Sequence, residues 1–465
     1  MRKRDDFTEW YPEVIEKANL SDKRYPIKGM NIWTPYGWKA MKLIDGFIRR
    51  EFDATDHDEV YFPLLIPETE FKKEADHIKG FEEWVYWVTH AGTTELDVRL
   101  LLRPTSETAM YPVFALWVRS HADLPLKVYQ IVNVFRYETK QTRAFMRVRE
   151  IHFFESHTCH DSFEDAERQI QENVEIIERL SKEYCLPYIL CKRPDWDKFA
   201  GAAYTIGIDT LMPTGRTLQL GSIHQYKTNF SEAYNITYED ENGQHKPVHQ
   251  TTFGMAERLL GAVIAVHGDD KGVMFPPQIA PIQVVIIPIL TKGSKTAVKN
   301  ECQEVYHELK EAGLRVHLDE RDLRPGNKFY DWEAKGVPLR IEIGNQDIQA
   351  KAVTVVRRDA ESKDMIQRNH MTSKVKDLVN QIQTEMMDRG EKEMRENTHL
   401  VNSLDDTEPG ILMMGWCGEE SCGHEIEDQT GMSVLGEPVG HEEYSGKCII
   451  CGNDTKTPIC VAKTY

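Results

Sequence analysis

Hydrophobic residues recur at helical spacing in several segments of the first 280 residues, and shorter runs rich in β-branched and aromatic residues lie between them. Such short runs favour strands, so helices and strands are expected to follow one another closely. Helices are predicted at 7–18, 38–48, 108–117, 161–184 and 257–266, and strands at 59–66, 84–88, 98–102, 129–137, 151–154, 188–191, 204–212, 217–220 and 248–253.

The predicted strand at 59–66 contains Pro63 and is followed by Pro67. Because proline has no N–H to donate, a strand that contains it is expected at the edge of a sheet or at an interface. A long helix precedes this strand, which makes a dimer interface an attractive hypothesis.

The pattern changes at Ile282, where buried strands begin to alternate with amphipathic helices. Strands are predicted at 283–290, 315–318, 339–343 and 352–357, and helices at 295–312, around 329–333 and at 375–387. This order is typical of a compact α/β unit with a mainly open sheet. Three domains are therefore expected, at 1–277, 282–388 and 391–465.

Composition and charge narrow the class of protein. The chain has no apolar run long enough to span a bilayer and no secretory signal behind its charged start, so a cytoplasmic protein without membrane contact is expected. Its net charge of −18 argues against a general nucleic-acid coat. Residues 391–465 contribute 15 acidic and 5 basic residues, a net charge of −10, so a basic face remains possible upstream.

A predicted antiparallel hairpin at 129–154 carries four cations in its loop, Lys140, Arg143, Arg147 and Arg149. Guanidinium groups bind phosphate oxygens in a bidentate manner, so this hairpin suits a nucleoside triphosphate. The alternative is a solvated hairpin whose arginines pair with nearby glutamates.

Two further groups of polar residues are candidates for a binding site. Thr105 is predicted to cap the helix at 108–117; with Glu107 it forms either a plain helix start or a grip for a substrate ammonium group. Gln219, Ser222 and His224 lie around a glycine kink in a strand, where a lone histidine is more often a satisfied structural group.

The α/β unit combines cations with aromatic residues between 321 and 340, including Phe329, Trp332 and Arg340. Bases stacked on aromatic rings, with cations on phosphates, are what recognition of single-stranded RNA requires. An ordinary charged surface is the alternative.

Five of the nine cysteines lie in the last 49 residues. Cys417 and Cys422 form one close pair, and Cys448 and Cys451 form the other. Four thiolates in two pairs predict a closed, structural Zn²⁺ site. Buried reduced thiols are the alternative, and Cys460 and His424 are spare candidate ligands.

These segments together resemble the class II aminoacyl-tRNA synthetases, and among them the prolyl-tRNA synthetase family of the archaeal and eukaryotic type. Three stretches are similar to the motifs of that class: the one ending in Phe62-Pro63, the hairpin that begins at Phe135-Arg136, and Gly254 to Arg258 with its helix. The resemblance covers the whole chain, down to the terminal Ala-Lys-Thr-Tyr465.

The resemblance implies an α+β catalytic domain with an antiparallel sheet flanked by helices, an α/β anticodon-binding domain and a small C-terminal zinc-binding domain. It implies ATP-dependent activation of L-proline, transfer to tRNA(Pro), a homodimer, and Mg²⁺ bound with ATP. Arg136 and Arg258 would be the catalytic residues. The ATP-binding residues would be Arg136, Glu138, Arg147, Gln219, Ser222 and Arg258.

In the same way, Thr105 and Glu107 would bind the imino nitrogen of proline, and Glu333 and Arg340 would read anticodon guanines. The rest of the proline pocket would be formed by Arg136, Phe153, Glu155, His157, His224 and Thr252. Phe153 and Phe253 stand where relatives can have tryptophan.

The segment between His157 and Thr252 is too short for the editing domain of bacterial-type relatives, so misactivation of alanine or cysteine is a hypothesis. Two alternatives stay open: a synthetase for threonine, serine or glycine, and a catalytically silent RNA-binding relative. Both ATP-site arginines, Arg136 and Arg258, are present, which disfavours the second.

Overall fold

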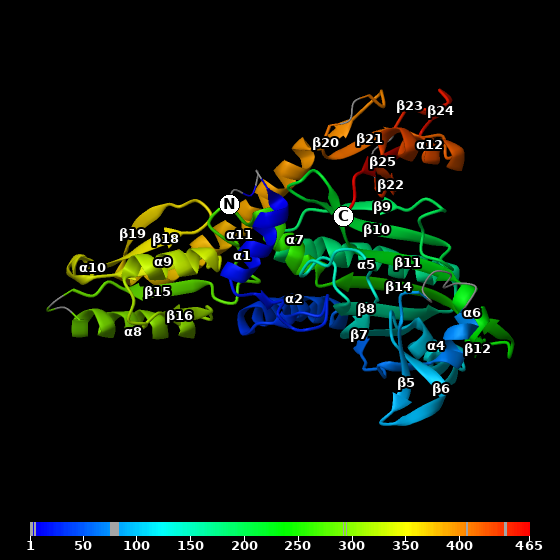
Figure 1. Cartoon of the computed structure of the whole chain (residues 1–465), viewed down its shortest axis with the longest axis horizontal. Coiled ribbons are helices and arrows are strands. Elements are labelled where there is room, and N and C mark those ends of the chain that lie inside the picture. Colours follow the sequence, from blue (N-terminus) through cyan, green and yellow to red (C-terminus); the bar gives the residue numbers. More distant parts are fainter. Residues whose placement is uncertain are drawn as a thin grey trace.

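An eleven-stranded sheet runs through the molecule (Figure 1). The computed structural model describes residues 3, 6–74, 83–291, 293, 295–405, 408–440 and 444–465. Neighbouring strands are antiparallel except for the two edge pairs. In sheet order the strands are β20 (Thr398–Leu400), β21 (Ile411–Gly415), β25 (Pro458–Ala462), β22 (Ser433–Pro438), β9 (Ile189–Lys192), β10 (Tyr204–Leu211), β11 (Thr217–Lys227), β14 (His249–Ala256), β8 (Glu150–His160), β7 (Leu126–Phe135) and β3 (Asp58–Glu59).

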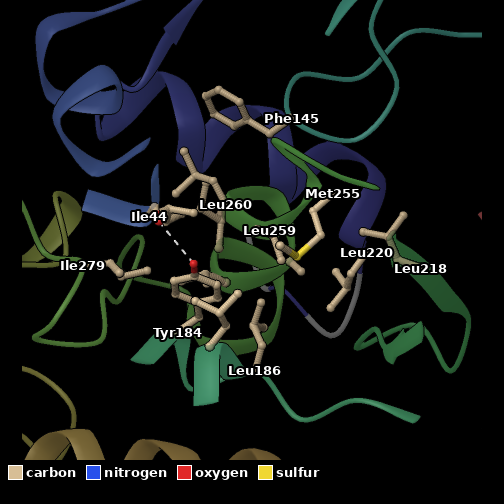
Figure 2. Close-up of a cluster of buried hydrophobic side chains, with 14 of the residues drawn as sticks. Ile44, Phe145, Tyr184, Leu186, Leu218, Leu220, Met255, Leu259, Leu260 and Ile279 are labelled. Atoms are coloured by element: carbon tan, nitrogen blue, oxygen red, sulfur yellow. Dashed lines mark hydrogen bonds between the residues drawn. The ribbon is translucent and has the colours of Figure 1, made fainter. Parts of the chain in front are cut away.

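Three helices, α2 (Pro35–Asp53), α5 (Phe163–Tyr184) and α7 (Arg258–His267), pack beside this sheet and one another. Helix α7 is apolar along nearly all of its length and is buried on every side. Figure 2 shows Leu259 and Leu260 of this helix among Ile44 and Tyr184, whose hydroxyl donates to the Ile44 carbonyl at 3.2 Å. This packing fixes the start of α7, where Arg258 lies.

A three-stranded sheet, β4 (Leu65–Pro67), β6 (Thr94–Leu102) and β5 (Tyr86–Ala91), lies outside the main sheet. The single strand predicted at 59–66 is wrong, because β3 ends at Glu59 and β4 begins at Leu65. Pro63 lies between them and cannot donate to a strand ladder. Helix α4 (Glu107–Trp117) follows β6, and its N-cap residue is Ser106, so the prediction that Thr105 caps the helix is also wrong.

The second sheet has the order β16 (Val316–Leu318), β15 (Val284–Pro288), β17 (Leu339–Ile343), β18 (Ala352–Arg357) and β19 (Lys363–Gln367). The first three strands are parallel and the last two pairs are antiparallel, so the expected α/β unit is confirmed. Its helices are α8 (Lys295–Glu311), α9 (Pro325–Ala334) and α10 (Asn345–Ala350). Strand β19 and helix α10 were not predicted.

The C-terminal strands belong to the main, eleven-stranded sheet. Strand β22 pairs with β9 through Glu437 opposite Lys192 and Pro438 opposite Cys191. The helix that leads to them, α11 (Met371–Glu396), is continuous through the predicted domain limits at 388–391. The limits of all three domains stay a prediction.

None of the helices in the described part of the chain is long and apolar enough to cross a membrane. The remaining helices and strands lie outside the two large sheets. They are α1 (Phe7–Lys17), β1 (Ser21–Asp22), β2 (Ile32–Trp33), α3 (Glu68–Phe71), α6 (Asn229–Tyr234), β12 (Thr237–Glu239), β13 (His245–Pro247), α12 (Glu420–Thr430), β23 (Gly446–Lys447) and β24 (Asp454–Thr455).

Candidate active site

A cavity of about 360 Å³ opens on the face of the main sheet opposite α5. Strands β8, β11 and β14 supply its floor, and the segment before α4 and the loop after β9 supply its walls. The predicted residues that line it are Thr105, Glu107, Arg136, Glu138, Arg147, Phe153, Glu155, Gln219, Ser222, His224, Thr252 and Arg258. The structure thus gathers residues from four separate stretches of the sequence, 105–107, 136–155, 219–224 and 252–258.

One end of the cavity is cationic. The Nε atom of Arg136 donates to the Pro104 carbonyl at 3.0 Å, and that of Arg258 donates to the Met146 carbonyl at 2.8 Å. Burial, together with repulsion from Arg136 and Arg147, lowers the pKa of Arg258 to about 10. The group is still charged at neutral pH, so this end is built to receive an anion with several oxygens.

Glu138 lies at the edge of this cationic end. Its carboxylate is 3.8 Å from Arg147 and accepts from the Lys140 N–H at 3.0 Å. Its carbonyl accepts from Arg149 at 2.9 Å. The alternative hypothesis is that the arginines of the hairpin pair with Glu138 and Glu150. Among the described ion pairs, only the 3.8 Å contact between Arg147 and Glu138 fits it. Arg136 and Arg258 line the cavity instead.

The other end of the cavity is anionic. Thr105 donates to one oxygen of Glu107 at 2.5 Å, and Tyr226 donates to the other at 3.0 Å. Glu107 is 2% exposed. A carboxylate that accepts from two hydroxyl groups still has lone pairs available to a cation.

Behind Thr105, Glu155 and His157 form a buried pair, with Nε2 of the histidine 3.1 Å from the carboxylate. Burial opposes both charges, but the hydrogen bond between the two residues lowers the pKa of Glu155 and raises the pKa of His157. The pair is held by Ser106 and Gln130 on the carboxylate and by Tyr111 and Thr252 near Nδ1. Because the two charges cancel, Glu107 supplies the net negative charge of this end.

His157 is the one predicted pocket residue that does not line the cavity. It acts from behind, through Glu155 and Thr252. Phe153, by contrast, lies in the cavity wall, and the Arg136 guanidinium is 5.8 Å from the centre of its ring. A flat apolar ring beside a cation and a carboxylate pair suits a small amino acid with an apolar side chain.

The glycine kink predicted in β11 is a β-bulge. The register with β10 shifts so that Gly221 pairs with Ile208 while Gln219 pairs with Asp209. A Cβ atom at Gly221 would lie 2.4 Å from the Gly254 carbonyl of β14, so only glycine fits there. The bulge turns both Gln219 and Ser222 toward the cavity.

His224 belongs to a chain of hydrogen bonds. The Phe199 N–H donates to Thr205 Oγ1 at 3.0 Å, Thr205 Oγ1 lies 2.9 Å from His224 Nδ1, and His224 Nε2 lies 2.8 Å from Ser222 Oγ. Burial lowers the pKa of His224 to about 3, so the ring is neutral. A neutral imidazole donates through one nitrogen and accepts through the other, so Thr205 and Ser222 take opposite hydrogen-bonding roles toward His224.

Residues that the sequence reasoning missed also line the cavity: Trp84, Arg193, Asp197, Phe199, Thr205 and Glu257. Arg193, Asp197 and Phe199 come from the loop between β9 and β10, which has no motif of its own. Only Glu257, next to Arg258, lay in a stretch that the sequence had singled out.

The buried carboxyl group of Glu257 predicts how the stability of the protein depends on pH. Burial raises its pKa to about 7 from an ordinary value of 4.5, while it accepts from the His152 N–H at 2.9 Å. The folded state keeps the proton up to about pH 7 and the unfolded state loses it near pH 4.5, so stability falls as pH rises between these values, by up to about 1.4 kcal/mol per pH unit. Glu257→Gln is expected to remove this loss.

The measurement is urea denaturation of both forms at pH 5 and pH 7.5. The variant should gain stability relative to the unsubstituted protein at pH 7.5 and not at pH 5. Glu175→Gln, at a side chain that is 70% exposed on α5, is the control. An equal difference at both pH values would contradict the assignment.

A second cavity, of about 280 Å³, lies on the α/β unit. Arg340 donates to Glu333 and to Glu342, both at 3.0 Å, and its guanidinium lies 4.1 Å from the Phe329 ring centre. Glu333, Arg340 and Phe329 line this cavity together with Trp332 and Lys363. A cation, carboxylates and aromatic rings around one hollow can both stack and hydrogen-bond a base.

The four cysteines of the C-terminal segment (residues 391–465) lie together, although they come from two distant stretches of the sequence. The sulfur atoms of Cys417, Cys422, Cys448 and Cys451 all lie within 4.8 Å of one another. Burial opposes ionisation of Cys448, but N–H groups around it lower its pKa to about 7. A set of four thiols at this spacing fits a tetrahedral Zn²⁺ site. Cys460 and His424 lie outside this cluster of four.

Residues 86–267 match the family model of the "tRNA synthetase class II core domain (G, H, P, S and T)", residues 283–378 match "Anticodon binding domain", and residues 399–465 match "Prolyl-tRNA synthetase, C-terminal". The fold and this set of domains define a class II aminoacyl-tRNA synthetase.

Whole-chain relatives narrow the class. The proline–tRNA ligase of Thermococcus kodakarensis is 54% identical, over 99% of this chain and 98% of its own, and that of Thermoplasma volcanium is 50% identical, over 98% of each. The structure of Giardia lamblia prolyl-tRNA synthetase in complex with prolyl-adenylate superposes with a TM-score of 0.97 at 33% identity, covering 100% of this chain and 99% of that one. The chain belongs to the prolyl-tRNA synthetase family, the proline–tRNA ligases.

Proposed function

We propose that the first cavity activates L-proline with ATP and then passes the prolyl group to tRNA(Pro). The observation that carries this proposal is the division of one cavity into a cationic end, with Arg136, Arg147 and Arg258, and an end with net negative charge at Glu107. ATP and an amino acid have the complementary charges, and their reacting groups would meet between the two ends. The complex of the Giardia relative with prolyl-adenylate supports the same use.

In this proposal the secondary ammonium group of proline binds Thr105 and Glu107, and its ring lies against Phe153 and His224. Arg136, between the two ends, binds the proline carboxylate and the α-phosphate. A carboxylate oxygen bonds to the α-phosphorus while the bond to the β-phosphate oxygen breaks, and pyrophosphate leaves. Arg258 holds the γ-phosphate. The rate enhancement then comes from positioning the two substrates and from stabilising the negative charge of the transition state.

Glu138 and Arg147 would hold the adenine end and the bent triphosphate. Gln219 and Ser222, which the bulge turns into the cavity, would lie beside ATP. The amide oxygen of Gln219 is a hard donor of the kind that suits a Mg²⁺ bound with the nucleotide, and that ion would neutralise phosphate charge. In the second step, a terminal ribose hydroxyl of the tRNA attacks the prolyl carbonyl and AMP leaves.

The decisive experiment is ATP–pyrophosphate exchange with each of the twenty amino acids, without tRNA. Exchange with proline should exceed the others by orders of magnitude. A peak at threonine, serine or glycine would overturn the pocket assignment, and no exchange at all would favour the silent RNA-binding relative. Exchange with alanine or cysteine above background is the expected sign of misactivation, because a small apolar pocket rejects similar ligands weakly.

The lack of an editing domain within the chain is part of this proposal. Residues 158–251, between two pocket residues, form α5, β9, β10, β11, α6 and the short β12–β13 hairpin, with the ends of β8 and β14. Strands β9, β10 and β11 belong to the main sheet and α5 packs on it. This arrangement supports the absence of a separate hydrolytic module there.

We also infer a homodimer. Around the proline-broken segment after β3, Tyr61 is 82% exposed, and Leu64, Leu65 and Trp117 are exposed as well. Trp117 contacts Phe62, with ring centres 5.6 Å apart, so these side chains form one apolar patch at the edge of the main sheet. A second copy of the chain is the proposed occupant.

Tyr61→Arg is expected to place a charge in that interface and to raise the dimer dissociation constant by at least about a hundredfold. Light scattering after size exclusion would measure the mass over a range of concentrations. Tyr25→Arg, at a tyrosine that is 49% exposed elsewhere, should leave the mass unchanged. A Tyr61→Arg protein that stays dimeric at low concentration would remove this patch from the interface.

For the second cavity we propose anticodon binding, in which Arg340 and Glu333 each hydrogen-bond to the edge of an anticodon guanine. Arg340→Ala is expected to raise the KM for tRNA(Pro) by about 10- to 100-fold, since a bidentate base contact contributes about 1–3 kcal/mol. Exchange with proline in the absence of tRNA should not change. Arg324→Ala, outside this cavity, is the control. An unchanged tRNA KM would rule out the assignment.

A further inference from the structure

The loop between β9 and β10 connects the C-terminal segment to the active-site cavity. Asp197 and Phe199 of this loop line the cavity. Trp196, immediately before Asp197, contacts the C-terminal segment instead: its ring centre lies 4.7 Å from that of His424 on α12 and 6.0 Å from that of Trp416. One loop therefore lines the cavity with Arg193, Asp197 and Phe199 and contacts the C-terminal segment with Trp196.

The contact between Trp196 and α12 is unusually close. A Cβ atom at Gly423 would lie 2.3 Å from Cη2 and 2.7 Å from Cζ2 of the indole. Only glycine at this position lets the six-membered ring of Trp196 lie against the helix backbone. Among the residues that the structure describes, the buried indole N–H finds no hydrogen-bond partner, so the contact depends on packing.

The near end of the same loop is held by Arg193. Its guanidinium donates to the Leu435 carbonyl of β22 at 2.7 Å and to the buried Asp209 at 2.6 Å. Two anchors, Arg193 and Trp196, thus fix the loop to the C-terminal segment immediately before Phe199.

The position of this loop affects the amino-acid pocket through Phe199. Its ring centre lies 4.8 Å from that of His224, and its N–H begins the hydrogen-bond chain through Thr205 and His224 to Ser222. A shift of the loop would move both the ring beside the amino-acid pocket and the N–H that donates to the Thr205 hydroxyl oxygen.

We propose that Trp196 is a positioning residue for the amino-acid pocket, through which helix α12 holds Phe199 and the Thr205–His224–Ser222 chain in place. The proposal rests on the proposed function of the first cavity. It predicts a specific kinetic effect: the KM for proline depends on the contact between Trp196 and Gly423, whereas the KM for ATP depends on it much less.

The test uses the full-length protein and proline-dependent pyrophosphate exchange. Trp196→Ala removes the contact from the loop, and Gly423→Ala pushes the indole away from the helix. Each is expected to raise the proline KM about tenfold with less than about a twofold change in the ATP KM. Asp428→Ala, at an exposed position on the same helix, is the matched control and should change neither.

Rescue separates positioning from general damage. Phenylalanine lacks Cη2 and Cζ2, the indole atoms nearest to position 423. Adding Trp196→Phe to Gly423→Ala should therefore lower the KM for proline most of the way back to that of the unsubstituted protein. If Gly423→Ala acted by disturbing the neighbouring Cys422, no such rescue would occur. The combination is also informative if Trp196→Ala alone does not fold.

A proline KM that stays within twofold in folded Trp196→Ala or Gly423→Ala protein would overturn the proposal, as would equal increases in the KM values for proline and ATP. The absence of rescue by Trp196→Phe would overturn it as well. Failure of the proposed function would look different, because the unsubstituted protein itself would then show no proline-dependent exchange.

Discussion

Arg136→Ala is expected to lower the rate of proline-dependent pyrophosphate exchange by about a thousandfold. Arg136 lies half-buried between the cationic and anionic ends of the cavity, with its Nε atom donating to the Pro104 carbonyl and its guanidinium near the Phe153 ring. At this position the guanidinium can bind the attacking carboxylate and the α-phosphate together. Alanine would remove the group that brings these two anions into contact and that stabilises the charge between them.

Two further variants separate charge from geometry. Arg136→Lys keeps the charge but loses the planar fork, so it should recover only part of the rate. Arg168→Ala, at a side chain that is 72% exposed on α5, is the control and should exchange normally. Single-turnover formation of the adenylate would show whether chemistry or binding has changed. Exchange within tenfold of the unsubstituted rate in Arg136→Ala would remove Arg136 from the centre of the reaction.

The second large effect is expected at the cysteine cluster. The purified protein should hold one Zn²⁺ per chain, and Cys448→Ser should lose the metal and much of the order of the C-terminal segment. Structural Zn²⁺ binds small domains with an apparent free energy of about 10–16 kcal/mol, and the cluster joins two stretches that are distant in the sequence. A fall in the unfolding temperature and faster hydrogen exchange in β21, β22 and β25 are the expected signs.

Atomic emission would count the metal, and hydrogen exchange would locate the loss of order. Cys302→Ala is the control, because Cys302 is buried in the α/β unit, away from the cluster. A protein that contains no metal and unfolds at the same temperature with or without a chelator would show that the four thiols are only a reduced core.

The sequence predicted these sites to different degrees, for physical reasons. Residue type alone identified the four cysteines and the arginines of the 129–154 hairpin, because few side chains can bind a metal or a triphosphate. The helices at 161–184 and 295–312 were predicted almost to their ends, since their apolar positions repeat every three to four residues. The fold class and the family were confirmed by the comparisons.

The loop between β9 and β10 could not be predicted from the sequence. Arg193, Trp196 and Phe199 lie in a short stretch with no periodicity, and their partners Leu435, Gly423 and His224 are far away in the chain. The pairing of β22 with β9 likewise depends on residues that are far apart in the sequence, so no local pattern predicts it. The predictions for Thr105 and for the strand at 59–66 failed because propensity does not say which of two adjacent residues begins a helix or where proline interrupts a ladder.

The pairing of β22 with β9 has a consequence for fragments of this chain. A protein cut before β20 would present the whole length of β9 as a bare edge, with N–H and C=O groups turned to water and the buried Cys191 beside them. Such an edge is a template for the next strand that arrives. Truncated molecules should therefore pair with one another and precipitate, whereas the missing peptide, added in trans, would compete for that edge and keep them dispersed.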